Sequence, residues 1–291
     1  MNPLNTLNPD VECSLSGLYV HPIKSCAGIA LQHSLLAHTG LDYDRQWMVV
    51  DEHGEMLTQR ALPRMALIQP TLRGSDMVLR APGMLALHVQ LDTVEAATRV
   101  RVWNDVVKAF DMGALAAQWF SDFLGSKLRL VRFDPDERRL ASAQWAGDIE
   151  AENGFADGFP LLVANQASLD DFNTRLAALG TAPVTMQRFR PNIVLQGLQA
   201  WDEDHLHEIQ IGSGDDAVRL RLVKPCIRCN IPDVDPLTAQ TGHDVGDMLA
   251  SFRADPRMNG GVTFGVNAVV VSGFEQTLRC AQAVSGSWKF D

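Results

Sequence analysis

The chain has 291 residues, of which 46% are hydrophobic and 21% are charged. This length predicts two folded domains, with enough apolar material for a core in each. The 35 acidic and 25 basic residues give a net charge of -10, which argues against a general nucleic-acid binder or a protein that docks on anionic membranes, because both need a positive surface. A small local anion site is still compatible with this balance.

The N-terminal sequence and the cysteine content indicate the cellular compartment of the protein. The opening stretch MNPLNTLNPDVECS has neither a basic start nor an apolar centre, so we expect no signal peptide. The five cysteines are an odd number on a long chain, which favours a reducing compartment over a disulfide framework. We therefore expect a cytoplasmic protein, and we take it to be a monomer.

Short strands and turns dominate the first hundred residues. The predicted elements are strands at 18–20, 46–50 and 100–103, and turns at 51–55, 73–76 and 81–83. Closely spaced short strands of this kind favour a small barrel or a sandwich.

The hydrophobic period then changes to that of a helix. Residues 114–124 are predicted to form an amphipathic helix that ends at Gly125. The apolar residues with this spacing are Leu115, Trp119, Phe120 and Phe123. We place the domain boundary here, with an N-terminal domain at 10–125 and a C-terminal domain at 126–291.

The second half mixes both periods. Ser168 is expected to cap a helix whose apolar face carries Leu169, Phe172, Leu176 and Leu179. A strict apolar–polar alternation over 218–222 predicts a half-buried strand, and 266–271 reads as a late apolar strand. The predicted fold class is therefore β-rich α+β with a few helices.

Two thiols lie close together in the motif Lys224-Pro225-Cys226-Ile227-Arg228-Cys229, which is expected directly after that strand. A zinc site would need about four ligands, usually a second such pair or a histidine pair, and neither follows. A thioredoxin-type pair would open a helix, which Pro232 and Pro236 oppose. Two buried cysteines in a loop remain the plainest interpretation of the pair alone. The flanking cations, however, favour a thiolate, which is a good ligand for a soft metal.

Five segments, in order along the chain, resemble the MOSC family. They are "VHPIKSC" at 20–26, "LDYDRQWMVVDEHGEMLTQR" at 41–60, "FADGFPLLVANQASLDDFNTRL" at 155–176, "FRPNIVL" at 189–195 and "KPCIRCNIPDVDP" at 224–236. Together they resemble the amidoxime-reducing components and the YcbX-like proteins, without a ferredoxin module or an N-terminal anchor. The resemblance implies an N-terminal MOSC β-barrel domain followed by a MOSC β-barrel domain, with molybdenum cofactor bound between them.

The resemblance also implies roles for single residues. Cys229 occupies the position of the molybdenum ligand, and Cys226 does not, so we expect Cys226 to be supportive or dispensable. Arg228 would contact the pterin, and Lys24 and Ser25 would hold the cofactor from the N-terminal domain. Arg45 and Arg190 would be cationic contacts to the cofactor and Asn192 a polar one. These residue types suit a ligand that carries a phosphate, a metal and a polar ring.

Three functions follow as hypotheses. The first is a molybdenum-dependent reductase of hydroxylamines, amidoximes or N-hydroxylated bases, which takes electrons from a separate ferredoxin- or flavin-type protein. The second is a carrier of molybdenum cofactor or of sulfur, because the chain also resembles the C-terminal part of molybdenum cofactor sulfurase, without its pyridoxal-phosphate domain. The third is a dithiol protein that uses Cys226 and Cys229 without a cofactor.

Overall fold

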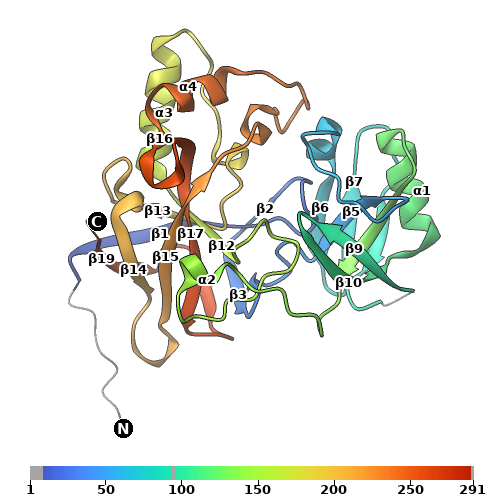
Figure 1. Cartoon of the computed structure of the whole chain (residues 1–291), viewed down its shortest axis with the longest axis horizontal. Coiled ribbons are helices and arrows are strands. Elements are labelled where there is room, and N and C mark those ends of the chain that lie inside the picture. The colour runs from blue at the N-terminus through green and yellow to red at the C-terminus, as the bar shows by residue number, and fades with distance from the viewer. Residues whose placement is uncertain (1–8, 94–95, 290–291) are drawn as a thin grey trace.

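A computed structural model of the chain describes residues 9–93 and 96–289. The prediction that the chain begins without a signal peptide rests partly on residues that lie outside this described part. Figure 1 shows two lobes side by side, with the first and last described strands, β1 and β19, in the larger lobe. The predicted strands and turns of the first hundred residues are confirmed in the smaller lobe and in the strand that precedes it.

Seven strands of the larger lobe close into a barrel. Their order around the ring is β12-β13-β1-β19-β14-β15-β17, and β17 pairs back to β12. The pair β12–β13 is parallel and the other ring pairs are antiparallel. The bounds are β1 (Val11–Val20), β12 (Leu161–Asn165), β13 (Ile193–Gln196), β14 (Leu206–Ile211), β15 (Val218–Ile227), β17 (Gly261–Ser272) and β19 (Ala283–Trp288). Closure leaves no open edge in this ring.

The barrel fills its interior with the alternate residues of these strands. On β15, Val218, Leu220 and Leu222 are buried while the two arginines between them are only half-buried, as the sequence alternation predicts. Two short strands extend the sheet: β2 (Ile29–Leu31) pairs with β1 and β16 (Ala254–Asp255) pairs with β17.

Two helices, α3 (Gln166–Ala178) and α4 (Asp244–Phe252), pack together at one end of the barrel (Figure 1). Beneath them Phe189 stacks on Phe264 with ring centroids 3.7 Å apart, and Phe172 meets Phe189 edge-on. This aromatic cluster fixes the chain just before Arg190.

A short helix, α2 (Ala143–Ala146), follows the smaller lobe. Short 3-10 helices are also present: η1 (Pro63–Leu67), η2 (Met186–Arg188), η3 (Asp202–His205), η4 (Gly214–Asp216), η5 (Ile231–Asp233) and η6 (Pro256–Met258).

The smaller lobe is built from two sheets and one helix. A four-stranded sheet has the order β5-β11-β10-β9, a three-stranded sheet has the order β6-β7-β8, and α1 (Gly113–Leu124) packs on their core. The bounds are β5 (Trp47–Asp51), β6 (Gln69–Arg73), β7 (Asp76–Arg80), β8 (Leu87–Gln90), β9 (Ala97–Val102), β10 (Asp105–Asp111) and β11 (Leu128–Phe133).

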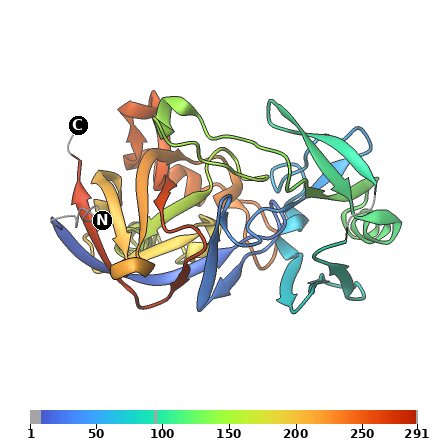
Figure 2. The same cartoon turned by 90° about the horizontal axis from the view of Figure 1, so that it is seen from below.

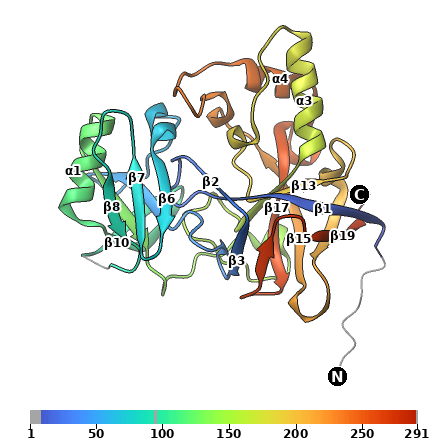
Figure 3. The same ribbon diagram turned by 180° about the vertical axis from the view of Figure 1, so that it is seen from behind.

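Segments far apart in sequence pair against the barrel, and other segments run between the two lobes. The strand β18 (Thr277–Arg279) of the C-terminal half pairs with β3 (His33–Ala37), which pairs with β4 (Gly40–Leu41). Figure 2 shows the green segment after β11 running back from the smaller lobe to the barrel, and Figure 3 shows β1 running along the barrel toward the smaller lobe. The β-rich class with barrel lobes and few helices is confirmed, and the division at 125 and 126 stays a prediction.

Three local expectations were wrong in detail. The helix at 114–124 is confirmed as α1, which ends at Gly125 with φ 80°, but Leu115 is 73% exposed and does not belong to its buried face. The side chain of Asn165 caps α3, whereas Ser168 is buried in its first turn and bonds elsewhere. Leu179 follows α3 and is 73% exposed, so it does not extend the apolar face.

The strand before the cysteine motif is also longer than the alternation indicates. β15 continues to Ile227, so Cys226 lies within the strand and only Arg228 and Cys229 follow it. The pairing with β17 carries the strand past Pro225, because register shifts at this point absorb the irregular geometry of the proline. None of the described helices has the length and apolarity that a bilayer crossing requires.

Candidate functional site

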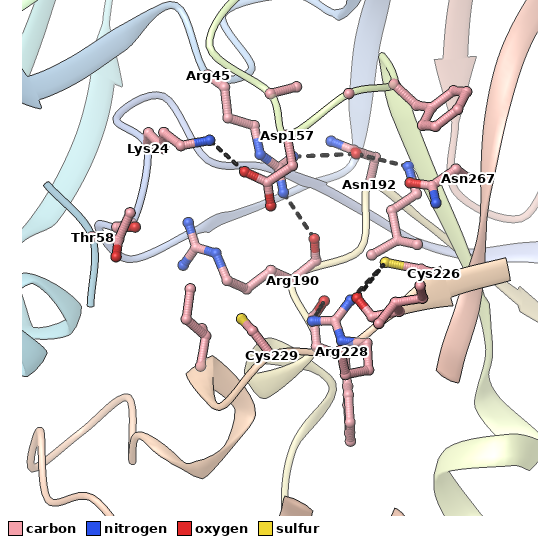
Figure 4. Close-up of a pocket in the computed structure, with 18 of the residues that line it drawn as sticks. Lys24, Arg45, Thr58, Asp157, Arg190, Asn192, Cys226, Arg228, Cys229 and Asn267 are labelled. Atoms are coloured by element: carbon pink, nitrogen blue, oxygen red, sulfur yellow. Dashed lines mark hydrogen bonds and ion pairs between the residues drawn. The ribbon is translucent and has the colours of Figure 1, made fainter. Parts of the chain in front are cut away.

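The seven residues singled out from the sequence all line one cavity between the two lobes. The cavity is open to solvent, and about 840 Å³ of space, part of it outside the protein surface, lies between its walls. Figure 4 shows that its walls come from both lobes, with Lys24 and Arg45 facing Cys229 and Arg228 across Arg190. The predicted residues in its lining are Lys24, Ser25, Arg45, Arg190, Asn192, Arg228 and Cys229.

Backbone pairing brings the two N-terminal motifs together at the end of β1. The amide of Lys24 donates to the carbonyl of Trp47 at 2.8 Å, and the amide of Arg45 donates to the carbonyl of His21 at 3.0 Å. These bonds lay the 21–24 segment beside 45–47. Lys24 and Arg45, separated by about twenty residues in sequence, therefore reach the cavity together.

Several site residues hold the left-handed backbone conformation that side chains other than glycine rarely adopt. Ser25 has φ 67°, Arg45 φ 49°, Arg190 φ 57° and Trp103 φ 56°. Such residues cost free energy and persist where the surrounding structure holds them, commonly at functional sites. Four of the ten such residues in the described part of the chain line this one cavity.

A hydrogen-bonded network fixes Arg45. Its Nη1 donates to Asp44 Oδ2 at 2.5 Å and to Asn192 Oδ1 at 3.2 Å, and its Nη2 donates to the Arg190 carbonyl at 3.0 Å. The same Asn192 Oδ1 accepts from the amide of Leu162 at 3.0 Å, and Asn192 Nδ2 donates to the Tyr19 carbonyl at 3.2 Å. Asn192 therefore positions Arg45 between β1, β12 and β13. Its predicted contact to a cofactor stays a prediction.

Asp44 anchors this network from behind the cavity. Its Oδ1 accepts from the amide of His21 at 2.7 Å. Burial alone would raise the pKa of Asp44, but the charge of Arg45 and the bond with His21 outweigh it and hold the pKa at about 2. Burial, with the charges of Arg190 and Arg45, lowers the pKa of His21 well below its usual value, so His21 is neutral beside the two arginines.

The cations of the cavity are only partly neutralised by protein groups. Arg190 donates from Nη1 to the Cys26 carbonyl at 2.7 Å, and burial together with the charge of Arg45 lowers its pKa to about 10. Burial also lowers the pKa of Lys24, although Asp157 partly offsets this. Both shifts have the direction expected when positive charges are buried near one another, and an anion in the cavity would relieve them.

The charge of the lining is opposite to that of the whole chain. Its charged members are five cations and one carboxylate, namely Lys24, Arg45, Arg60, Arg190, Arg228 and Asp157. In a protein with ten more acidic than basic residues, this concentration of positive charge predicts an anionic ligand.

The cysteine motif forms the opposite wall. Arg228 donates from Nη1 to Cys226 Sγ at 3.1 Å and from Nη2 to the Phe189 carbonyl at 2.9 Å. Its guanidinium is thus tied to the strand and to the aromatic cluster. Cys229, beyond the end of β15, is an exposed free cysteine in the cavity. The two thiols therefore differ, since Cys226 has a cation bonded to its sulfur and Cys229 is open to a ligand.

Two stretches of the chain match known family models. Residues 12–127 match the MOSC N-terminal beta barrel domain, and residues 150–283 match the MOSC domain. The human mitochondrial amidoxime-reducing component 1 is 34% identical over 254 residues, which cover 84% of this chain and 73% of that protein. The chain belongs to the MOSC family.

Other MOSC relatives extend the comparison. The mitochondrial amidoxime reducing component 2 of Bos taurus is 34% identical over 234 residues, which cover 77% of this chain and 67% of that protein. The human molybdenum cofactor sulfurase is 31% identical over 256 residues, which cover 82% of this chain and 28% of that protein. The predicted resemblance is therefore confirmed at the level of the family, while the roles of the seven site residues stay predictions.

The MOSC cavity also contains residues that the sequence reasoning missed. The missed charged or polar members are Thr58, Arg60, Trp103, Asp157 and Asn267. Three of them lie inside segments quoted for the resemblance: Thr58 and Arg60 end the 41–60 stretch, and Asp157 follows Phe155 and Ala156. No sequence pattern pointed to Trp103, which reaches the cavity from the tip of the β9–β10 hairpin.

Proposed function

We propose that this cavity binds molybdenum cofactor and that the chain is a reductase of N-hydroxylated compounds, supplied with electrons by a separate ferredoxin- or flavin-type protein. The observation that carries the proposal is that five cations and the exposed thiol of Cys229 line one cavity, whose walls come from both lobes. The names of the amidoxime reducing relatives support the choice of reaction.

The donor groups fit such a cofactor. A phosphate calls for guanidinium and ammonium donors, which Lys24, Arg45 and Arg190 would supply from three separate segments. A polar ring needs directional partners, and we assign these to Ser25, Asn192 and Arg228. A terminal molybdenum needs a soft ligand, which the Cys229 thiolate would provide.

When bound, the cofactor would supply two electrons that, with two protons, convert an N–OH group to N–H and water. The protein itself would bind and orient the cofactor and the substrate and tune the reactivity of the metal. The Asp44–Arg45–Asn192 network keeps one cation in a fixed place, so little reorganisation is needed when an anion enters.

A second candidate is a carrier that delivers molybdenum cofactor or sulfur. The openness of the Cys229 thiol and the sulfurase relative favour it. A carrier would transfer its bound cofactor to a cofactor-free acceptor enzyme without a reaction of its own.

The deciding experiment is an N-reduction assay on the cofactor-loaded full chain, with benzamidoxime as substrate and reduced methyl viologen as electron donor. The reductase proposal expects benzamidine to form in proportion to the molybdenum content of the preparation. Loaded protein that forms no benzamidine, yet restores activity to a cofactor-free acceptor enzyme, would replace the reductase with the carrier.

A further inference from the structure

One carboxylate, that of Asp157, stands among the cations of the described cavity lining. Asp157 belongs to the loop that leads into β12. Although the residue lines the cavity between the two lobes, its side chain is 76% exposed to solvent. Figure 4 shows the carboxylate reaching into the space that Lys24, Arg190 and Cys229 surround.

The protein uses only one of the two oxygens of this carboxylate. Asp157 Oδ1 accepts from Lys24 Nζ at 2.5 Å and from Trp103 Nε1 at 3.1 Å. Within residues 9–93 and 96–289 the structure shows no donor on Oδ2. An ionised carboxylate has acceptor capacity on both oxygens, so Oδ2 has room for a donor from a bound molecule.

The two donors on Oδ1 are themselves held in place. Lys24 Nζ also donates to the Phe155 carbonyl at 2.7 Å. Trp103 comes from the smaller lobe, and the guanidinium of Arg60 lies 4.6 Å from the centre of its ring. Both donors lie within residues 12–127, whereas the carboxylate lies on the loop that leads into β12. The carboxylate is therefore oriented by groups across the cavity, which is the pre-organisation that a recognition site needs.

The carboxylate is ionised at neutral pH. The cavity walls partly withdraw the carboxylate from water, which would raise the pKa of Asp157, but the charge and hydrogen bond of Lys24 outweigh this and keep the pKa below its usual range. Asp157 therefore acts only as a hydrogen-bond acceptor, and a substrate atom next to Oδ2 has to be a donor.

We propose that Asp157 is a specificity-determining residue: its free Oδ2 accepts a hydrogen bond from an amino group on the carbon that carries the N-hydroxylated nitrogen. This inference rests on the proposed reductase function. The cavity then prefers N-hydroxylated compounds with such an amino group over oximes that have hydrogen in its place. Compounds that place a carbonyl oxygen there are disfavoured, because two acceptors would face each other.

The test compares benzamidoxime with benzaldoxime, which share the ring and the N–OH group and differ in the amino group. Both are assayed with the loaded full chain, with molybdenum measured in each preparation, in the wild type, Asp157→Asn and Asp148→Asn. The last variant removes a carboxylate whose side chain is 90% exposed and lies outside the cavity lining. A hydrogen bond to a charged group predicts that Asp157→Asn lowers the kcat/KM ratio of the two substrates about 10- to 100-fold, with no change in Asp148→Asn.

Titration calorimetry gives a readout that does not depend on turnover. We expect Asp157→Asn to weaken the binding of benzamidine to the loaded protein about 10- to 100-fold, while the binding of benzonitrile, which has no N–H donor, changes little. Equal losses for both substrates and both ligands would show a purely structural role for Asp157 and overturn the inference while leaving the reductase proposal standing. A loaded wild type that reduces neither substrate would overturn the reductase proposal, and this inference with it.

Discussion

A buried carboxyl group beneath α3 makes the stability of the protein depend on pH. Glu203 is fully buried, and its Oε2 is bonded by Ser168 Oγ at 2.7 Å, whereas its Oε1 has no partner among the described residues. Burial, aided by the charge of Asp204, raises the pKa of Glu203 from 4.5 to about 7. The buried group therefore keeps its proton to a higher pH than the unfolded chain does.

The sign of the effect follows from proton binding. Between about pH 4.5 and 7 the folded state holds a proton on Glu203 that the unfolded state has released, so stability falls as pH rises through this window. The full cost, on the order of 3 kcal/mol for a shift of this size, is present above pH 7. Glu203→Gln mimics the protonated form and escapes this cost, so we expect the variant to match the wild type near pH 4.5 and to exceed it by roughly 3 kcal/mol at pH 8.

Urea denaturation of both proteins at pH 5 and pH 8 measures the difference directly. Glu12→Gln serves as the control, because Glu12 is an exposed carboxylate on β1 and its replacement should leave the free energy of unfolding nearly unchanged at both values. A stability gain for Glu203→Gln that is the same at pH 5 and pH 8 would refute the reasoning, because it could not come from titration.

Two further variants test how the fold holds the site. Asp44→Asn leaves Arg45 without its buried partner, so we expect a loss of about 3 kcal/mol in unfolding free energy at neutral pH; the loss should fade as pH falls from about 4 to 2, where wild-type Asp44 is itself protonated. Gly265→Ala should lose about 2 kcal/mol or more in thermal or urea unfolding, because φ is +73° and a Cβ would lie 2.8 Å from the Val163 carbonyl oxygen, whereas Gly242→Ala, with open space around it, should change little. A neutral Gly265→Ala, or an Asp44→Asn loss that persists at pH 2, would contradict these accounts.

The sequence predicts the fold well where one hydrophobic period persists. The alternation along 218–222 and the helical spacing at 119–123 both correspond to elements of the structure. Predictions of local detail, such as helix caps, are wrong where tertiary contacts override the local preference of a residue. Ser168 is a good capping residue, yet its hydroxyl bonds to Glu203, thirty-five residues away, and Asn165 takes the cap.

The cavity residues likewise fall into those that the sequence could predict and those that depend on tertiary contacts. Residues carried by contiguous motifs, such as Lys24 and Cys229, could be named from the sequence and are brought together by the structure. Trp103 could not, because it reaches the cavity through a hydrogen bond to Asp157, 54 residues away, from the tip of a hairpin with no motif of its own. The engagement of the Asn192 side chain with two backbone groups and Arg45 likewise depends on strand neighbours that periodicity does not reveal.

The most direct test of the proposed cofactor site is the molybdenum and pterin content of the full chain purified from a host that makes the cofactor. Wild type is compared with Cys229→Ser and with Cys280→Ser, a control at a partly buried thiol outside the cavity lining. Our account predicts near-stoichiometric molybdenum in the wild type and the control, and loss of the metal in Cys229→Ser. A Cys229→Ser protein that retains as much molybdenum as the wild type, or a wild type with none, would contradict it.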